Sequence, residues 1–197
     1  MMLGLINRNF KHMSISTFVA LPKIMVRCHL NYCCSVSLPY RKGDIEALEK
    51  LQKRAAKLIP ALKNLPYKDH LKLKVCNMST LHYRRVRGDM IETYKILSGK
   101  YDTNVVPHLK TTGIQATRGN DLRIFKTRFK YHLRKFYFTN NRVVDAWNSL
   151  PNWIVMANST NTFKHRLDIY WQDQEIIYDF HAQLQGTRSR SNIFRFD

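Results

Sequence analysis

The clearest pattern of hydrophobic and polar positions lies between Asp44 and Ile59. Apolar residues recur there every three or four positions, which is the spacing of one face of an α-helix. Asp44 can cap the first amide groups of this helix, and Pro60 ends it. We therefore predict a helix over residues 44–59 whose buried stripe consists of Ile45, Leu48, Leu51, Ala55, Leu58 and Ile59.

A second long helix is predicted to end near Leu97. Ser79 or Thr80 can cap its first turn, and Gly99 is a typical C-terminal stop residue. Shorter helices are predicted over residues 2–11, 16–34 (bent or broken at the proline in position 22) and 67–73. The expected core positions of the long helix are Tyr83, Val86, Met90, Ile91, Tyr94 and Leu97.

The pattern changes after position 98. Residues 99–121 contain several glycines and few apolar side chains, which predicts a long loop and a boundary between two subdomains. Apolar and basic residues alternate imperfectly over 122–138, which predicts a short β-hairpin. Two further helices are predicted, the first over residues 139–150, where Pro151 ends it, and the second capped by Ser159 or Thr160. Their buried residues are expected to be Val143, Val144, Trp147, Leu150, Phe163, Leu167, Tyr170 and Trp171, and Trp153 is also expected to pack inside.

These elements predict a mainly α protein. Its parts would be a small helical bundle over 1–98, a loop or linker over 99–121, a C-terminal subdomain over 122–172 and a tail of loop or disorder over 173–197. With 197 residues, 44% of them hydrophobic, the chain is long enough to bury a core and is not typical of a disordered protein.

The charge of the chain narrows the classes of partner. Lys and Arg number 33 against 14 Asp and Glu, a formal net charge of +19. Such an excess suits a polyanion, either nucleic acid or an anionic membrane surface, and we favour nucleic acid. The longest apolar run, residues 15–26, is interrupted at Pro22 and Lys23, so no membrane segment is expected.

Two groups of basic residues are candidates for contacts with phosphates. Lys50, Lys53, Arg54 and Lys57 fall opposite the predicted apolar stripe, so that one helix could follow a phosphate backbone; a merely solvated helix face is the alternative. Arg84, Arg85 and Arg87 could make forked contacts to phosphates. Arg85 could instead pair with Asp89 four residues on, whereas Arg87 has no acid at that spacing.

The segment from Arg123 to Lys135 interleaves aromatic and basic residues, as proteins that bind single strands do when bases stack on their rings. Aromatic residues are more often part of a core. Both interpretations stay open from the sequence.

Signatures of enzymes and metal sites are missing from the sequence. No two acidic residues are adjacent, the four cysteines lack CxxC spacing, and the histidines are scattered. Neither a GxSxG nucleophile motif nor a GxxxxGK[ST] phosphate loop occurs. We expect no enzyme activity, no cofactor, no metal and no small-molecule substrate. Four cysteines without a disulfide framework suit a nuclear or cytoplasmic setting.

Four sequence segments occur in this order along the chain: DIEALEKLQKRAAKLIP, YRRVRGDMIETYKIL, NRVVDAWNSLP and TNTFKHRLDIYW. Together with LGLINRNF, HLNYCCSVSLPY, LSGKYD and TRG, they resemble the carboxy-terminal part of the reverse transcriptase of non-LTR (LINE-type, jockey-like) retrotransposons. The resemblance covers residues 2 to 172. The chain departs from the family at Ser37, where an aromatic residue is usual, and at Pro22, which lies in a usually unbroken helix.

The resemblance implies a thumb-like helical region over 1–98 followed by the segment that closes the polymerase, without the palm whose carboxylates hold the catalytic metal ions. A noncatalytic fragment that binds RNA or an RNA–DNA duplex through its basic helices is the expectation. One alternative is a degenerate retroelement remnant with no selected activity. Another is a subunit that docks onto a reverse-transcriptase palm in another chain.

Overall fold

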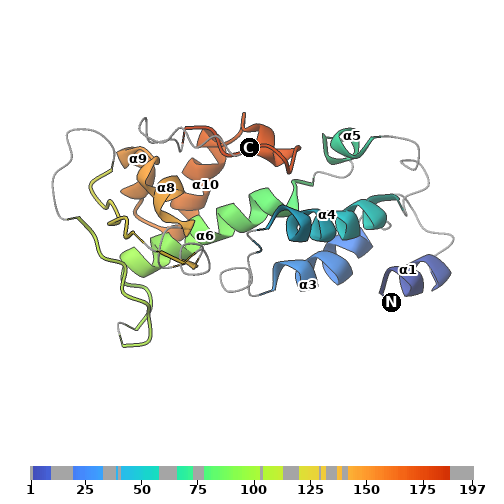
Figure 1. Ribbon diagram of the computed structural model, residues 1–197, viewed down its shortest axis with the longest axis horizontal. Helices are drawn as coiled ribbons and strands as arrows, with labels where there is room; N and C mark the ends of the chain where they lie inside the picture. Colours follow the sequence, from blue (N-terminus) through green and yellow to red (C-terminus); the bar gives the residue numbers. More distant parts are fainter. Residues whose placement is uncertain are drawn as a thin grey trace. The chain divides into compact units, whose positions relative to one another are not determined.

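The computed structural model describes residues 2–9, 20–32, 39, 41–57, 66–72, 78–102, 104–112, 120–128, 130–131, 137–138 and 142–186. These residues form a mainly α structure, as predicted (Figure 1). Its helices are α1 (Met2–Asn9), α3 (Arg27–Asn31), α4 (Lys42–Lys57), α5 (Tyr67–Lys72), α6 (Leu81–Leu97), α8 (Val144–Asn148), α9 (Asn152–Val155) and α10 (Thr160–Tyr170). A π-helical turn η1 (Pro22–Val26) and a 3₁₀ turn η4 (Glu175–Ile177) complete the set.

The chain divides into two compact units. The first contains Met1–Arg85 and Glu175–Ala182, and the second contains Val86–Gln174 and Gln183–Asp197. The chain therefore passes from the first unit to the second inside α6, whereas the boundary predicted from the sequence lies in the loop 99–121. A tail of loop or disorder was also predicted after position 172. That is wrong for Ile176, which is buried in the first unit.

Local capping chemistry defines both ends of α6, as the sequence predicted. The amide of Tyr83 donates to Thr80 Oγ1 at 3.1 Å, so Thr80 is the capping residue. At the other end Gly99 adopts a positive φ of 64°. Its amide donates to Ile96 O at 3.2 Å, and the next amide donates to Lys95 O at 3.1 Å. This pair of bonds is the Schellman motif, in which glycine is favoured because a Cβ strains the left-handed conformation.

In the first unit the buried face of α4 differs from the predicted stripe. Leu51 is 38% exposed, Ile45 and Leu48 are half-buried, and Leu58 and Ile59 lie outside the described residues. The helix begins at Lys42, so Asp44 lies in its first turn and does not precede it. The residues that α4 buries are Glu49, Gln52, Ala55 and Ala56. Two of these four are polar, and they form the centre of the site described below.

The segment around Pro22 shows how the N-terminal helices are interrupted. A π-helical turn begins at Pro22 and leads directly into α3. Proline cannot donate the amide hydrogen bond of a regular helix, and a wider turn accommodates this loss. The helix predicted to bend or break at Pro22 thus changes there to a π-helical turn.

The second unit is organised around aromatic side chains. The rings of Tyr94 and Phe163 stack with centroids 4.4 Å apart, and Trp147 lies 5.9 Å from Phe163. Figure 1 shows α8, α9 and α10 beside the C-terminal half of α6, which carries Tyr94. Ser159 accepts a bond from Thr162 N at 3.1 Å and so caps α10 as predicted. The predicted burial of Val143, Val144, Trp147, Leu150, Phe163, Leu167 and Trp171 is confirmed.

Three expectations for this unit are corrected. Trp153 is 48% exposed and Tyr170 is 41% exposed, so neither is a core residue. The helix predicted to begin at 139 is assigned only from Val144; positions 139–141 lie outside the described residues. Within the described residues no strand forms, and the one antiparallel bridge joins Ile124 to Thr111 in the preceding loop.

Among the helices that the structure describes, none has the length and apolar character needed to cross a membrane.

Candidate nucleic-acid interface

Three basic side chains of α4 share an exposed face. At 100° per residue, Lys50, Arg54 and Lys57 lie within about 60° of one another around the helix. All three are exposed, and the centre of this group lies opposite the buried face of the helix. Within the described part of the chain, no carboxylate forms an ion pair with any of them. We call these three residues the α4 basic face.

Lys53, the fourth residue of the predicted stripe, does not belong to this face. Its side chain is half-buried, and its Nζ lies 5.1 Å from the ring centroid of Tyr67 and 4.8 Å from that of Phe180. These distances are typical of cation–π contacts. Lys53 therefore packs inside the first unit, where it contacts a helix and a segment that are distant in the sequence.

The side of α4 away from the solvent carries a buried carboxylate. Glu49 Oε1 accepts hydrogen bonds from the amides of Leu81, at 2.7 Å, and His82, at 3.2 Å. Its other oxygen accepts a 2.7 Å bond from the hydroxyl of Tyr67. The carboxylate thus occupies the N-terminal end of α6, where free amides and the helix dipole favour negative charge.

Gln52, one turn along, completes the network. Its Oε1 accepts a 3.0 Å bond from Arg27 Nε. Its Nε2 donates to the Tyr67 hydroxyl at 2.7 Å and to Ser79 O at 3.2 Å. Arg27 Nη2 also donates to Ser79 O. Because each buried group has a partner, the network fixes the rotation of α4 about its axis.

The residues in and beside this network have altered pKa values. Burial, followed by the nearby charge of Glu49, raises the pKa of Tyr67 well above its ordinary value, so the hydroxyl remains a donor. Burial, then the charge of Arg84, lowers the pKa of Arg27 to about 10, which still leaves the guanidinium protonated near neutral pH. Burial, then Arg85, lowers the pKa of His82.

The hydrophobic pattern did not predict this network, because Glu49 and Gln52 are residue types that usually face water. A signal was present. On a helical wheel both residues fall on the same side as Ala55 and Ala56, which are small enough for close packing.

The predicted arginine cluster does not form one surface. Arg84 is exposed, but Arg85 is only 5% exposed and donates from Nη2 to Leu30 O at 2.7 Å. Arg87 makes a forked pair with Asp168 of α10, at 2.6 and 2.7 Å. Asp89, the expected partner of Arg85, pairs instead with Arg142 at 2.6 and 2.9 Å. Arg85 and Arg87 are therefore structural residues in their respective units.

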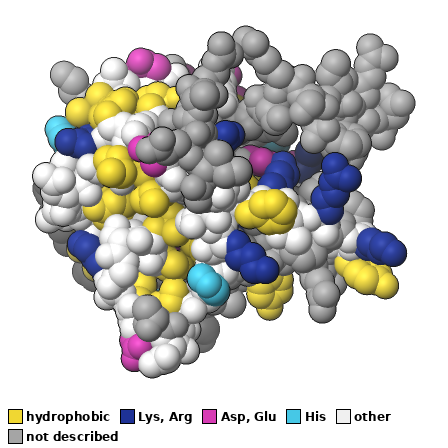
Figure 2. Space-filling view, turned by 90° about the vertical axis from the view of Figure 1, so that its left-hand side faces the viewer, with side chains coloured by type: hydrophobic (Ala, Val, Ile, Leu, Met, Phe, Trp, Pro, Cys, Tyr) yellow, Lys and Arg dark blue, Asp and Glu magenta, His cyan; other side chains and the backbone are white. Residues whose placement is uncertain are grey.

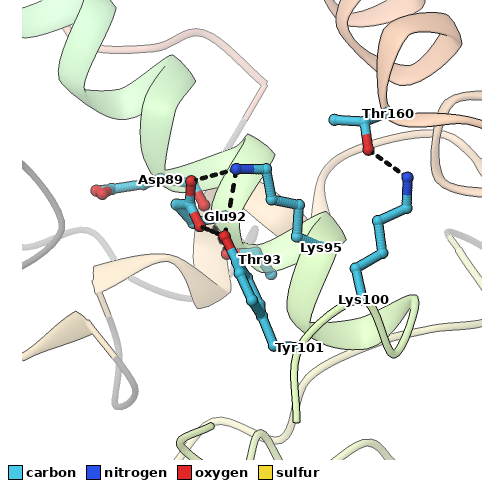
Figure 3. Close-up of polar contacts among 7 residues, drawn as sticks. All are labelled: Asp89, Glu92, Thr93, Lys95, Lys100, Tyr101 and Thr160. Atoms are coloured by element: carbon cyan, nitrogen blue, oxygen red, sulfur yellow. Dashed lines mark hydrogen bonds and ion pairs between the residues drawn. The ribbon is translucent and has the colours of Figure 1, made fainter.

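A polar cluster at the C-terminal end of α6 belongs to the second unit (Figure 3). Lys95 Nζ donates to Glu92 at 2.8 Å and to the Tyr101 hydroxyl at 3.3 Å, and that hydroxyl donates to Glu92 at 2.6 Å. Burial alone would raise the pKa of Glu92, but the bonds from Lys95 and Tyr101 outweigh it and lower the pKa. Nearby, Lys100 donates to Thr160 at 2.6 Å. The cluster holds the loop after α6 against the helix, and the Glu92 and Lys95 side chains bond to each other and to Tyr101.

Over the described residues no three His, Cys, Asp or Glu side chains gather in a way that could hold a metal ion. No family model, curated protein or solved structure matches the chain.

Proposed function

We propose that this chain is a noncatalytic fragment of a non-LTR retrotransposon reverse transcriptase that binds RNA or an RNA–DNA duplex. The α4 basic face carries the proposal: Lys50, Arg54 and Lys57 are exposed and unneutralised among the described residues. The sequence resemblance to the thumb region supplies the class of protein.

Phosphate binding by this face has a simple physical basis. Lys50 and Lys57 are seven residues apart, which corresponds to roughly 10 Å along a helix axis. That length spans about three phosphates of one strand, taking their spacing as roughly 3.4 Å along the duplex axis. Each contact releases condensed counterions, so the affinity would be strongly dependent on salt and nearly independent of base sequence.

The buried side of α4 supports the same interpretation. Glu49 and Gln52 hold the helix in one orientation, and the three cations then point to solvent without further ordering of the backbone. A preorganised face loses less entropy on binding than a flexible basic segment.

The noncatalytic part of the proposal rests on the sequence. A polymerase active site needs closely placed carboxylates that hold two metal ions, and no two acidic residues of this chain are adjacent.

The test is binding of the full chain to a labelled RNA–DNA hybrid across a salt series. The variant Lys50→Gln, Arg54→Gln, Lys57→Gln should lower the slope of log affinity against log salt by roughly 2 to 3, since each phosphate contact contributes about 0.7–0.9. The control variant Lys95→Gln, Lys100→Gln, Lys126→Gln removes the same charge from residues that have partners within the protein. Equal slopes for both variants would contradict the proposal.

Cooperative unfolding, followed by urea or heat, separates the proposal from a degenerate remnant. A folded chain whose binding affinity depends steeply on salt favours binding of nucleic acid through a defined face. An unfolded chain that binds with the same slope in both variants favours the remnant, because its charges then act without a defined face.

A further inference from the structure

A second basic region lies in the second unit and has a different composition. Between Asp121 and Asp145 the sequence contains seven Lys or Arg, six Phe or Tyr, and no acid. The described part shows that three of its aromatic rings face solvent: Phe125 is 54% exposed, Tyr131 is 74% exposed and Tyr137 is 68% exposed. The more common fate of aromatic residues, burial in a core, does not apply to these rings.

The backbone at Phe125 is fixed. Ile124 is buried and exchanges two 2.9 Å hydrogen bonds with the side chain of Asn148. The amide of Phe125 donates to Lys110 O at 2.8 Å. Because successive side chains of an extended segment point to opposite sides, burial of Ile124 directs Phe125 outward. The ring is thus presented to solvent on a rigid support.

Basic residues follow Phe125 in the sequence, and Lys110 lies beside it, since its carbonyl accepts the Phe125 amide. Lys126 pairs with Asp145 at 2.6 and 2.8 Å. Lys110, Arg128 and Lys130 are exposed, and no described acid forms an ion pair with them. Figure 2 views the side on which α8 and α9 lie, where hydrophobic side chains cover a broad area with separate Lys and Arg among them.

We propose that Phe125 and Tyr131, with Arg128 and Lys130, form a binding site for single-stranded nucleic acid. Bases stack on the two exposed rings, and the strand's phosphates contact the cations. A duplex cannot use the rings in this way, since its bases are already stacked on one another. The site therefore differs in ligand from the α4 basic face and does not depend on it.

Charge favours a nucleic acid over an apolar protein surface as the occupant. A protein partner would bury Arg128 and Lys130 without counterions, which is costly. Protein interface cores are accordingly depleted of lysine. A strand that brings one phosphate per base satisfies both parts of the site.

Three ligands test the proposal on the full chain: a single-stranded RNA oligomer, an abasic strand of the same length, and a duplex. The variant Phe125→Leu, Tyr131→Leu keeps net charge and apolar bulk but removes the rings. It should bind the base-bearing strand at least about fivefold more weakly for each ring. Its affinity for the abasic strand and for the duplex should not change. Tyr32→Leu, which alters a ring that is 77% exposed in the first unit, is the matched control and should bind normally.

The variant Phe125→Trp guards against a loss caused by misfolding. It should keep the affinity, and its fluorescence should be quenched by the base-bearing strand but not by the abasic one. Equal binding of base-bearing and abasic strands by the parent chain would overturn the proposal. So would normal binding by the leucine variant combined with weak binding by Phe125→Ala, Tyr131→Ala, because that result indicates an apolar contact. Loss of duplex binding in the α4 triple variant reports on the other face alone.

Discussion

The carboxylate of Glu49, buried in α4, accepts a 2.7 Å hydrogen bond from the amide of Leu81, the residue at which α6 begins. The same carboxylate accepts from His82, and Thr80 accepts the amide of Tyr83. Three amides in the first turn of α6 thus donate to side chains. Two of these amides donate to Glu49, which lies in another helix. The start of α6 is therefore joined to α4 by a charged group, and the stability of the first unit depends on that group.

Glu49→Ala should lower the free energy of unfolding by about 3 kcal/mol, since it leaves amides and the Tyr67 hydroxyl buried without their acceptor. Urea unfolding with an unchanged m-value is the measurement. Glu46→Ala, three residues earlier on a half-buried side chain, should cost less than about 0.5 kcal/mol. Similar losses for the two variants would show that the carboxylate does not hold α6.

Asp89 and Glu92 of α6 both pair with cations in the second unit, but they differ in exposure. The side chains of Asp89 and Arg142 are 4% and 8% exposed, whereas those of Glu92 and Lys95 are 34% and 29% exposed. Asp89→Asn should lower the free energy of unfolding by about 3–5 kcal/mol, because it leaves the buried guanidinium of Arg142 without a negative partner. Glu92→Gln should cost no more than about 1 kcal/mol because water screens the pair. The measurement is thermal unfolding, and equal decreases in the free energy of unfolding for the two variants would contradict this prediction.

His82 should make the first unit sensitive to mild acid. Burial and the charge of Arg85 lower its pKa in the folded chain below the ordinary value of 6.5. Well above pH 6.5 the imidazole is neutral in both states and has no effect on stability. Below that pH the unfolded chain takes up a proton that the folded chain does not, so stability falls as pH falls. His82→Gln should flatten the stability profile between about pH 6.5 and 5. A profile identical to that of the parent chain would count against the assignment.

The predictable part of the fold is the part set by neighbours in sequence. Thr80, Gly99 and Ser159 act through hydrogen bonds within a few residues, so their roles could be identified from the sequence. The spacing that placed Tyr94 and Phe163 on apolar faces is equally local, and both rings are in the core.

The unpredicted part depends on partners far away in the chain. Arg87 and Asp168 are separated by 81 positions, so no helical spacing reveals their pair. Glu49 and Gln52 are buried because α6 and Arg27 supply bonds to them, a condition that a hydrophobicity pattern does not contain. Of the candidate site residues, Lys50, Arg54 and Lys57 keep the predicted exposure, whereas Lys53 and Arg85 are drawn inward by packing.

Lys50 and Lys53 allow a test of the interface in which the change in charge is the same. Both lie on α4, and each loses one positive charge on substitution by glutamine. Lys50→Gln should leave stability within about 0.5 kcal/mol of the parent, since its side chain is exposed. If Lys50 contacts a phosphate, its loss should reduce the salt slope of hybrid binding by about 1.

Lys53→Gln should instead lower the free energy of unfolding without changing nucleic-acid binding. It removes cation–π contacts with Tyr67 and Phe180, which contribute about 0.5–1 kcal/mol each, and should leave the salt slope unchanged. Equal slope changes for the two variants would mean that the net charge of the helix, and not its outward face, determines binding.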